Sequence, residues 1–166
     1  PSGKLPITFY NSADDLPAFE DYAMKNRTYR YFNGDVQYPF GYGLTYTAFS
    51  LTECEIKGLT IRCKVKNTGK MPCDEVLQVY IKQPETAYSN PIRSLIAVSR
   101  FALRPEEEKE IQFSLTDKDL YSVNENGDTV FLNGIYTFTV SDGQNITSEP
   151  LYFENEEKTA VIEKCP

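Results

Sequence analysis

The side chains best suited to acid–base chemistry in this sequence are three pairs of adjacent carboxylates, Asp14-Asp15, Glu20-Asp21 and Asp74-Glu75. Each pair contains the residue types of a general acid and a general base. However, the side chains of adjacent residues usually diverge in direction, and charged side chains usually stay exposed. We therefore interpret these pairs as solvated surface or turn capping, and we assign no catalytic residue to the chain.

The sequence contains no His, the side chain that most often serves as a general base or a metal ligand near neutral pH. Its four cysteines show neither CxxC pairs nor the spacing of zinc ligands; they are Cys54, Cys63, Cys73 and Cys165. These observations argue against a self-contained active site. We predict no metal site and no cofactor.

The cysteines also bear on the cellular compartment. A hairpin turn at Lys57-Gly58 would place Cys54 opposite Ile61, so that Cys54 and Cys63 would lie diagonally and be poorly placed for a disulfide. We therefore expect reduced thiols, which favour a cytoplasmic location.

Composition and charge exclude two classes of partner. The chain has 17 basic and 24 acidic residues, a net charge of −7, so a nucleic acid would be repelled at long range. No apolar run reaches the roughly 18 residues that a membrane-spanning helix needs. With 40% apolar and 25% charged residues, the sequence is typical of a soluble folded domain that binds neither nucleic acid nor membrane.

The best candidate for a binding function is the basic and aromatic segment of residues 25–32. Within it, Arg27, Tyr29, Arg30 and Tyr31 can hydrogen-bond and stack against a polar ligand, which would make them substrate-adjacent. Alternatively, the two arginines pair with carboxylates across a domain junction while the aromatic rings fill it. We favour the domain junction because the surrounding apolar residues require burial.

The elements expected around these residues are short β-strands. Ile61, Cys63 and Val65 alternate with polar neighbours, and the same period recurs at residues 77–81, 111–115 and 136–140. An apolar stretch at residues 95–103 either switches sheets or is covered on both faces. Turns rich in Gly and Asn separate the runs. About seven such strands predict an all-β fold, a fibronectin type III or immunoglobulin-like β-sandwich.

Residues 1–45 have a different texture, and we predict an irregular aromatic-rich extension there. Residues 5–9 favour a strand, but no sustained period follows, although loops beyond about 12–15 residues are uncommon. The extension carries many aromatic side chains that would be costly to leave in water. We expect it to pack on the sandwich and on another domain. The predicted organisation is thus residues 1–45, a sandwich over 46–155, and an acidic tail over 156–166 with an apolar patch at Ala160-Val161-Ile162.

Several motifs in register resemble the C-terminal region of family 3 glycoside hydrolases. They are PSGKLPITF at residues 1–9, YAMKNRTYRYF at 22–32 and YPFGYGLTYTAF at 38–49, followed by VKNTG at 65–69 and DEVLQVYI at 74–81. The last two resemble the fibronectin type III-like domain of these enzymes. The resemblance covers nearly the whole chain, and the first motifs match the last strand of an α/β sandwich domain and a crossing segment.

The resemblance implies a parent enzyme but no catalysis in this chain. Members of the family retain anomeric configuration with two carboxylates. Their nucleophilic Asp lies in an upstream barrel domain and their acid/base in an α/β sandwich domain, and neither motif has a counterpart here. Because the chain begins with Pro1 and has no initiator Met, we expect coding sequence upstream of it.

Three functions follow as hypotheses. The first is a non-catalytic structural module of an exo-acting retaining β-glycosidase, a β-xylosidase or a β-glucosidase, that buttresses the upstream barrel and α/β sandwich domains. The parent would hydrolyse the O-glycosyl bonds of a β-linked oligosaccharide, whereas this chain alone would be inactive. The second is an independent carbohydrate-binding module. The third is a protein–protein interaction domain that uses the aromatic flank or an open sheet edge.

Overall fold

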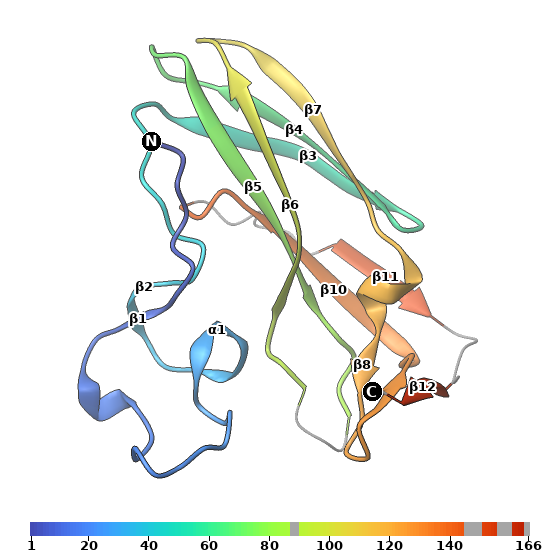
Figure 1. Ribbon diagram of the computed structural model, residues 1–166. Coiled ribbons are helices and arrows are strands. Elements are labelled where there is room, and N and C mark those ends of the chain that lie inside the picture. The colour runs from blue at the N-terminus through green and yellow to red at the C-terminus, as the bar shows by residue number, and fades with distance from the viewer. Residues whose placement is uncertain (87–89, 145–150, 156–160, 165–166) are drawn as a thin grey trace.

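The computed structural model describes residues 1–86, 90–144, 151–155 and 161–164, and it shows a β-sandwich with an arm beside it (Figure 1). One sheet has the strand order β11-β10-β5-β6, and the other has the order β3-β4-β7; both are antiparallel. The strands are β3 (Phe49–Lys57), β4 (Thr60–Asn67), β5 (Cys73–Lys82), β6 (Ser94–Leu103), β7 (Glu108–Ser114), β10 (Gly134–Ser141) and β11 (Leu151–Asn155). This confirms the predicted all-β sandwich.

The core lies between the two sheets and follows the alternation of the sequence. Ile61, Cys63 and Val65 are buried on β4, whereas Arg62 between them is exposed. The opposite sheet contributes inward residues with the same period, because successive side chains of a strand point to opposite faces. These residues include Leu77, Val79 and Ile81 of β5 and Tyr136, Phe138 and Val140 of β10.

Strand β6 differs from the expectation for residues 95–103. It pairs with β5 from Ser94 to Leu103 and stays in one sheet, at its edge. Most of its residues are partly or fully exposed, including Val98, whereas Phe101 and Leu103 are buried in the core. The stretch therefore neither switches sheets nor is covered on both faces.

A smaller antiparallel sheet, β12-β9-β8, lies at the lower end of the sandwich in Figure 1. It consists of β8 (Ser122–Val123), β9 (Asp128–Val130) and β12 (Val161–Lys164), and the 3₁₀ helix η2 (Asp117–Leu120) precedes it. Strand β12 includes Val161 and Ile162 of the apolar patch in the acidic tail, whereas Ala160 lies outside the described residues. Within the described residues, no helix is long and apolar enough to cross a membrane.

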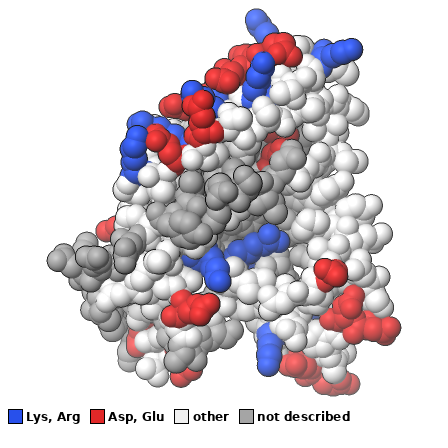
Figure 2. All heavy atoms as spheres, turned by 180° about the vertical axis from the view of Figure 1, so that it is seen from behind, with Lys and Arg blue, Asp and Glu red and all other residues white. Residues whose placement is uncertain are grey.

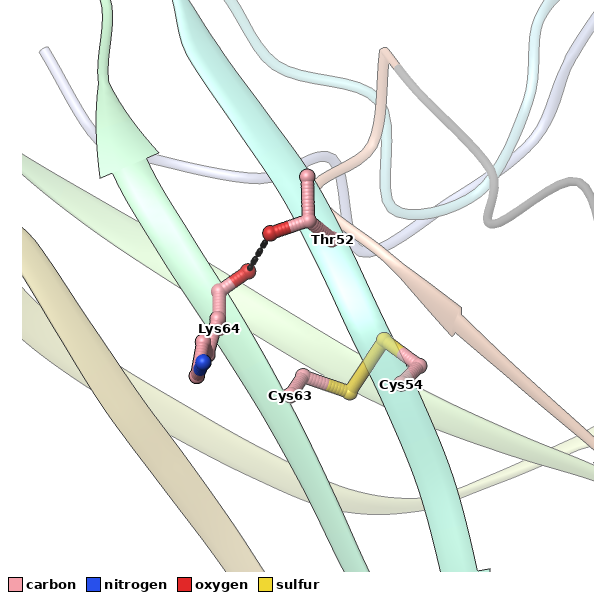
Figure 3. The surroundings of a disulfide bond; sticks show 4 residues. All are labelled: Thr52, Cys54, Cys63 and Lys64. Atoms are coloured by element: carbon pink, nitrogen blue, oxygen red, sulfur yellow. Dashed lines mark hydrogen bonds between the residues drawn. A yellow bond between two sulfur atoms is a disulfide. The ribbon is translucent and has the colours of Figure 1, made fainter.

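The prediction that Cys54 and Cys63 are reduced is wrong, because the structure joins them in a disulfide between β3 and β4 (Figure 3). The hairpin turn falls at Gly58-Leu59, one residue later than expected, so that Lys57 pairs with Thr60. Gly58 has a φ of +56°, a conformation that glycine adopts without steric cost.

This shift of the turn places Cys54 directly opposite Cys63, with the two Cα atoms 4.2 Å apart. That separation is typical of a non-hydrogen-bonded pair in an antiparallel sheet. Cys73 is a free thiol, and Cys165 lies outside the described residues. The argument from reduced thiols to a cytoplasmic location therefore loses its support at Cys54 and Cys63.

The arm, defined as residues 1–45, runs along one side of the sandwich (Figure 1). It contains β1 (Phe9–Tyr10), the 3₁₀ helix η1 (Ala13–Asp15), the single-turn helix α1 (Thr28–Tyr31) and β2 (Val36–Tyr38). Strands β1 and β2 pair with each other in a sheet of their own. The strand expected at residues 5–9 is thus shorter and begins at Phe9, and α1 was not predicted.

Candidate functional site

The arm is attached to the sandwich by a buried ion pair. Lys4 Nζ lies 2.6 Å from Glu75 Oε1, and only 7% and 2% of the two side chains are exposed. Lys4 also donates to the carbonyl oxygen of Asp142, and the same Glu75 oxygen accepts the Val76 backbone N–H at 2.7 Å. Removing one partner of such a pair leaves an uncompensated buried charge. The pair therefore fixes the beginning of the arm to β5.

Backbone contacts extend this attachment along the arm. The Leu5 N–H donates to the Tyr42 carbonyl at 2.8 Å, and the Gly41 N–H donates to the Leu5 carbonyl at 2.9 Å. Gly41 has a φ of +85°, and a Cβ atom there would lie 2.4 Å from the hydroxyl of Tyr80. Only glycine satisfies both the conformation and the close approach. The glycine-rich connector therefore serves as a close contact with β5.

Tyr29 makes the third attachment. Its ring stacks on Phe40 with centroids 4.0 Å apart and meets the edge of Tyr80 at 6.2 Å. Its hydroxyl accepts the Leu95 N–H at 3.1 Å. Next to it, the Arg30 carbonyl accepts the Ile92 N–H at 2.7 Å. Helix α1 is thus held against the beginning of β6 and the residues just before it.

Arg27 is used within the arm. Its guanidinium donates to the carbonyl oxygens of Ala18 at 3.2 Å, Ala23 at 3.1 Å and Asp21. The pairing with a carboxylate that the domain-junction interpretation gave it does not occur among the described residues. Instead, Arg27 braces the loop of residues 18–23 by donating hydrogen bonds to three of its backbone carbonyl groups.

The four predicted site residues therefore do not form one site. Arg27 and Tyr29 face the protein itself, whereas Arg30 is exposed and its guanidinium carbon lies 5.8 Å from the Tyr31 ring centroid. Of the four, the structure leaves Arg30 and the half-buried Tyr31 to contact a partner.

The paired carboxylates separate into two kinds. Asp15 accepts the Ser12 N–H at 2.9 Å in the cap of η1, and Asp74 pairs with Arg100 at 2.7 Å on the surface. These agree with the interpretation as capping and solvated surface. Glu75 does not, because it is buried against Lys4. Its position two residues before Leu77 on the inward face of β5 was the signal in the sequence.

The outer side of the arm exposes apolar side chains. Phe19 and Tyr22 lie in the loop braced by Arg27 and are 90% and 88% exposed, with Met24 beside them also exposed. A shallow apolar groove of about 560 Å³ lies on the arm between residues that include Phe9 and Tyr38, whose rings are in edge contact with centroids 6.1 Å apart. Exposed aromatic surface held in a fixed shape marks an interaction site.

On the sandwich, unlike the apolar outer side of the arm, charged side chains of both signs lie close together. Figure 2 shows Lys and Arg intermingled with Asp and Glu along its upper left edge, with much of this face uncharged. On the sheet β3-β4-β7, Lys64 pairs with Glu53 and Lys66 pairs with Glu106. Hydrogen bonds to these glutamates and their charges raise the pKa of both lysines. Exposed pairs of this kind contribute little to stability.

Tyr80, which contacts the stacked rings of Tyr29 and Phe40, has a raised pKa. Burial raises its pKa to about 12, and the charge of Arg93 lowers it by less. The unfolded chain loses the phenolic proton near its ordinary pKa of about 10, before the folded protein does. We expect the free energy of unfolding to fall between about pH 10 and 12, by up to about 2–3 kcal/mol.

Urea unfolding at a series of pH values, compared between the natural chain and Tyr80→Phe, measures this contribution. The difference between the two is expected to change between pH 10 and 12, because phenylalanine has no proton to lose. A constant difference over that range would show that Tyr80 titrates normally.

Comparison with known proteins places these features in a class. The model of the fibronectin type III-like domain matches residues 75–144, which begin within β5 and end just after β10. A xylan 1,4-β-xylosidase of Xylanibacter ruminicola is 37% identical over 126 residues, covering 72% of this chain and 14% of the relative. A β-glucosidase of Ruminococcus albus is 31% identical and covers 99% of this chain and 20% of the relative.

Solved structures of β-glucosidases have the same fold as this chain. The structure of β-glucosidase 3B from Thermotoga neapolitana in complex with glycerol superposes with a TM-score of 0.82 at 31% identity, covering 95% of this chain and 25% of that one. The chain is a β-sandwich protein with a fibronectin type III-like domain. It corresponds to the region of family 3 glycoside hydrolases that includes this domain, and the relatives are β-xylosidases and β-glucosidases. This confirms the resemblance drawn from the motifs. It spans 14–20% of the length of the curated relatives it matches.

Proposed function

We propose that this chain is a non-catalytic module of an exo-acting retaining β-glycosidase, a β-xylosidase or β-glucosidase, and that it buttresses the catalytic domains. The arm at residues 1–45 would be the contact and the sandwich at 46–155 its support. The observation that carries the proposal is the two-sided construction of the arm. Its inner side is fixed to the sandwich by Lys4, Gly41 and Tyr29, whereas its outer side exposes Phe19 and Tyr22.

The outer side is preorganised for a protein partner. Arg27 holds the loop backbone in place through three carbonyl oxygens, so the loop has little conformational entropy left to lose on binding. Burial of aromatic surface contributes about 25 cal/mol for each Å² removed from water. The partners we propose are the barrel and α/β sandwich domains that precede this region in the parent enzyme, with a β-linked oligosaccharide as their substrate.

Two further features support a structural rather than a catalytic role. The sequence has no His, and the carboxylate pairs cap turns, pair with Arg100 or lie buried against Lys4. Among the described residues, no group of His, Cys, Asp and Glu is arranged to hold a metal ion. Asp15, Asp74 and Glu75 thus have structural partners, and we expect activity to reside in the domains that this chain supports.

An activity assay tests the first half of the proposal. We expect the 166-residue chain to release no nitrophenol from nitrophenyl β-xyloside or nitrophenyl β-glucoside above a buffer blank. Turnover that persists through repeated purification, and that scales with the concentration of the chain, would contradict the proposal.

Paired variants of the complete gene product test the second half. Replacing both Phe19 and Tyr22 with Ser should lower its melting temperature and its glycosidase activity, because their side chains would be buried between domains. The same changes should leave the melting temperature of the 166-residue chain within about 1 °C, since both side chains are exposed in it. The matched control is Ser at Val123 and Ile135, which are exposed on β8 and β10, away from the arm's loop. Equal effects of the two double variants in the complete protein would contradict the docking role.

A further inference from the structure

A second concave site lies where the arm meets the sandwich, on the inner side of the arm. It is a pocket of about 310 Å³ built from the arm, from β5 and from β10. Its cations are Lys82 and Arg93, its hydroxyl groups include Thr137 and Thr139, and its aromatic walls include Phe40 and Tyr80. The proposed docking surface on the outer side of the arm shares none of these six residues.

Arg93 is the residue that gives this pocket its chemistry. Its guanidinium carbon lies 5.4 Å from the centroid of the Tyr80 ring, within the range of a cation–π contact. Its Nε is buried and has no hydrogen-bond partner in the part of the chain that the structure describes. A guanidinium normally uses its donors as a planar fork for a carboxylate or phosphate. The Nε donor is thus unpaired, and Arg93 is among the residues that line the pocket.

The described residues that line the pocket with Arg93 include no Asp or Glu, so none of them compensates its charge. Lys82 lies 4.0 Å from Glu85, but those side chains are 55% and 92% exposed, so the pair is weak. The Tyr80 phenol donates to Gln78 Oε1 at 3.0 Å and stays neutral in physiological conditions. In a chain of net charge −7, this is a locally positive cavity.

We propose that this pocket binds the carboxylate of a small hydroxylated organic acid about the size of one uronic acid unit. Arg93 would bind the carboxylate, Thr137 and Thr139 would bind hydroxyl groups, and the ring of Phe40 would cover an apolar face of the ligand. An inorganic anion would leave the apolar walls without a contact, and a neutral sugar would leave the guanidinium unpaired. The volume is at the lower end of ligand pockets, which suits a single ring. The inference does not depend on the proposed structural function.

NMR titration of the 166-residue chain tests the site with three probes: sodium D-glucuronate, methyl β-D-glucoside and inorganic phosphate. We expect glucuronate to bind saturably, with a Kd on the order of 1 mM and with shifts centred on the amides of Thr137, Thr139 and Arg93. The other two probes should bind at least about tenfold more weakly, because the glucoside lacks the carboxylate and phosphate lacks the hydroxylated ring.

Variants assign the binding to Arg93. Arg93→Gln should weaken glucuronate binding about tenfold or more, and Arg93→Lys should weaken it less, because it keeps the charge and loses the fork. The matched control, Arg62→Gln, removes an exposed cation from β4 and should leave the affinity unchanged. Melting temperatures of all three variants show whether each remains folded. If Arg93→Gln does not fold, Arg93→Lys serves as the test.

Three results would overturn the proposal. The first is the absence of saturable glucuronate binding up to about 50 mM. The second is equal affinity for the glucoside or for phosphate. The third is unchanged affinity in a folded Arg93 variant. None of these results bears on the docking of the outer side of the arm, which is measured in the complete gene product.

Discussion

Replacing Lys4 with Met is expected to lower the free energy of unfolding of this chain by about 3–5 kcal/mol. The substitution keeps the length of the side chain and removes the cation that lies 2.6 Å from Glu75. Glu75 then remains buried as an unpaired carboxylate, and the Asp142 carbonyl loses its donor. Urea unfolding followed by tyrosine fluorescence measures the change.

Two companion variants separate this interpretation from a general effect of losing a lysine. Lys57→Met removes an exposed partner of Glu55 and is expected to change stability by less than about 1 kcal/mol. The double variant Lys4→Met with Glu75→Leu should recover much of the lost stability, because it removes both charges of the pair and leaves no unpaired carboxylate buried. A loss of less than 1 kcal/mol for Lys4→Met alone would show that the pair does not hold the arm.

Replacing Tyr29 with Ala is the second large effect, with an expected loss of about 3 kcal/mol. The ring contacts both Phe40 of the arm and Tyr80 of β5, and its hydroxyl accepts the Leu95 N–H. Tyr29→Phe keeps the ring contacts and loses the hydrogen bond, so about 1 kcal/mol is expected from it. Thermal and urea unfolding of both variants give the two values.

The control for Tyr29 is Tyr46→Ala, which removes an exposed tyrosine close to the beginning of the sandwich. Its stability should stay within about 0.5 kcal/mol of the natural chain. If Tyr29→Ala were as mild as Tyr46→Ala, helix α1 would contribute nothing to the attachment, and the arm would depend on Lys4 and the backbone contacts alone.

The sandwich could be predicted because its strands are half-buried and therefore alternate. The inward residues of β4, β5 and β10 share the period of two that burial on one face imposes. The same period places Glu75 on the inward face of β5, in line with Leu77. That a carboxylate could occupy this face depends on Lys4, which is 71 residues away in the sequence and which no local pattern connects to it.

The disulfide and the internal contacts of the arm could not be predicted from local patterns, although the extension at residues 1–45 could. A turn one residue later along the hairpin changes which residue faces Cys63, since every pairing moves with the turn. Helix α1 is a single turn, too short for a helical period, and it is held by Leu95 and Ile92. The candidate segment was found because it is aromatic and basic, but the inward direction of Arg27 and Tyr29 is a property of tertiary contacts.

The most direct test of the proposed docking role is hydroxyl-radical footprinting of Phe19, Tyr22 and Met24, in the 166-residue chain and in the complete gene product. All three side chains are exposed in this chain and should be oxidised readily. We expect strong protection of all three in the complete protein, with Val123 oxidised equally in both. Equal oxidation of Phe19 and Tyr22 in the two proteins would show that no neighbouring domain covers the arm, and would contradict the proposed function.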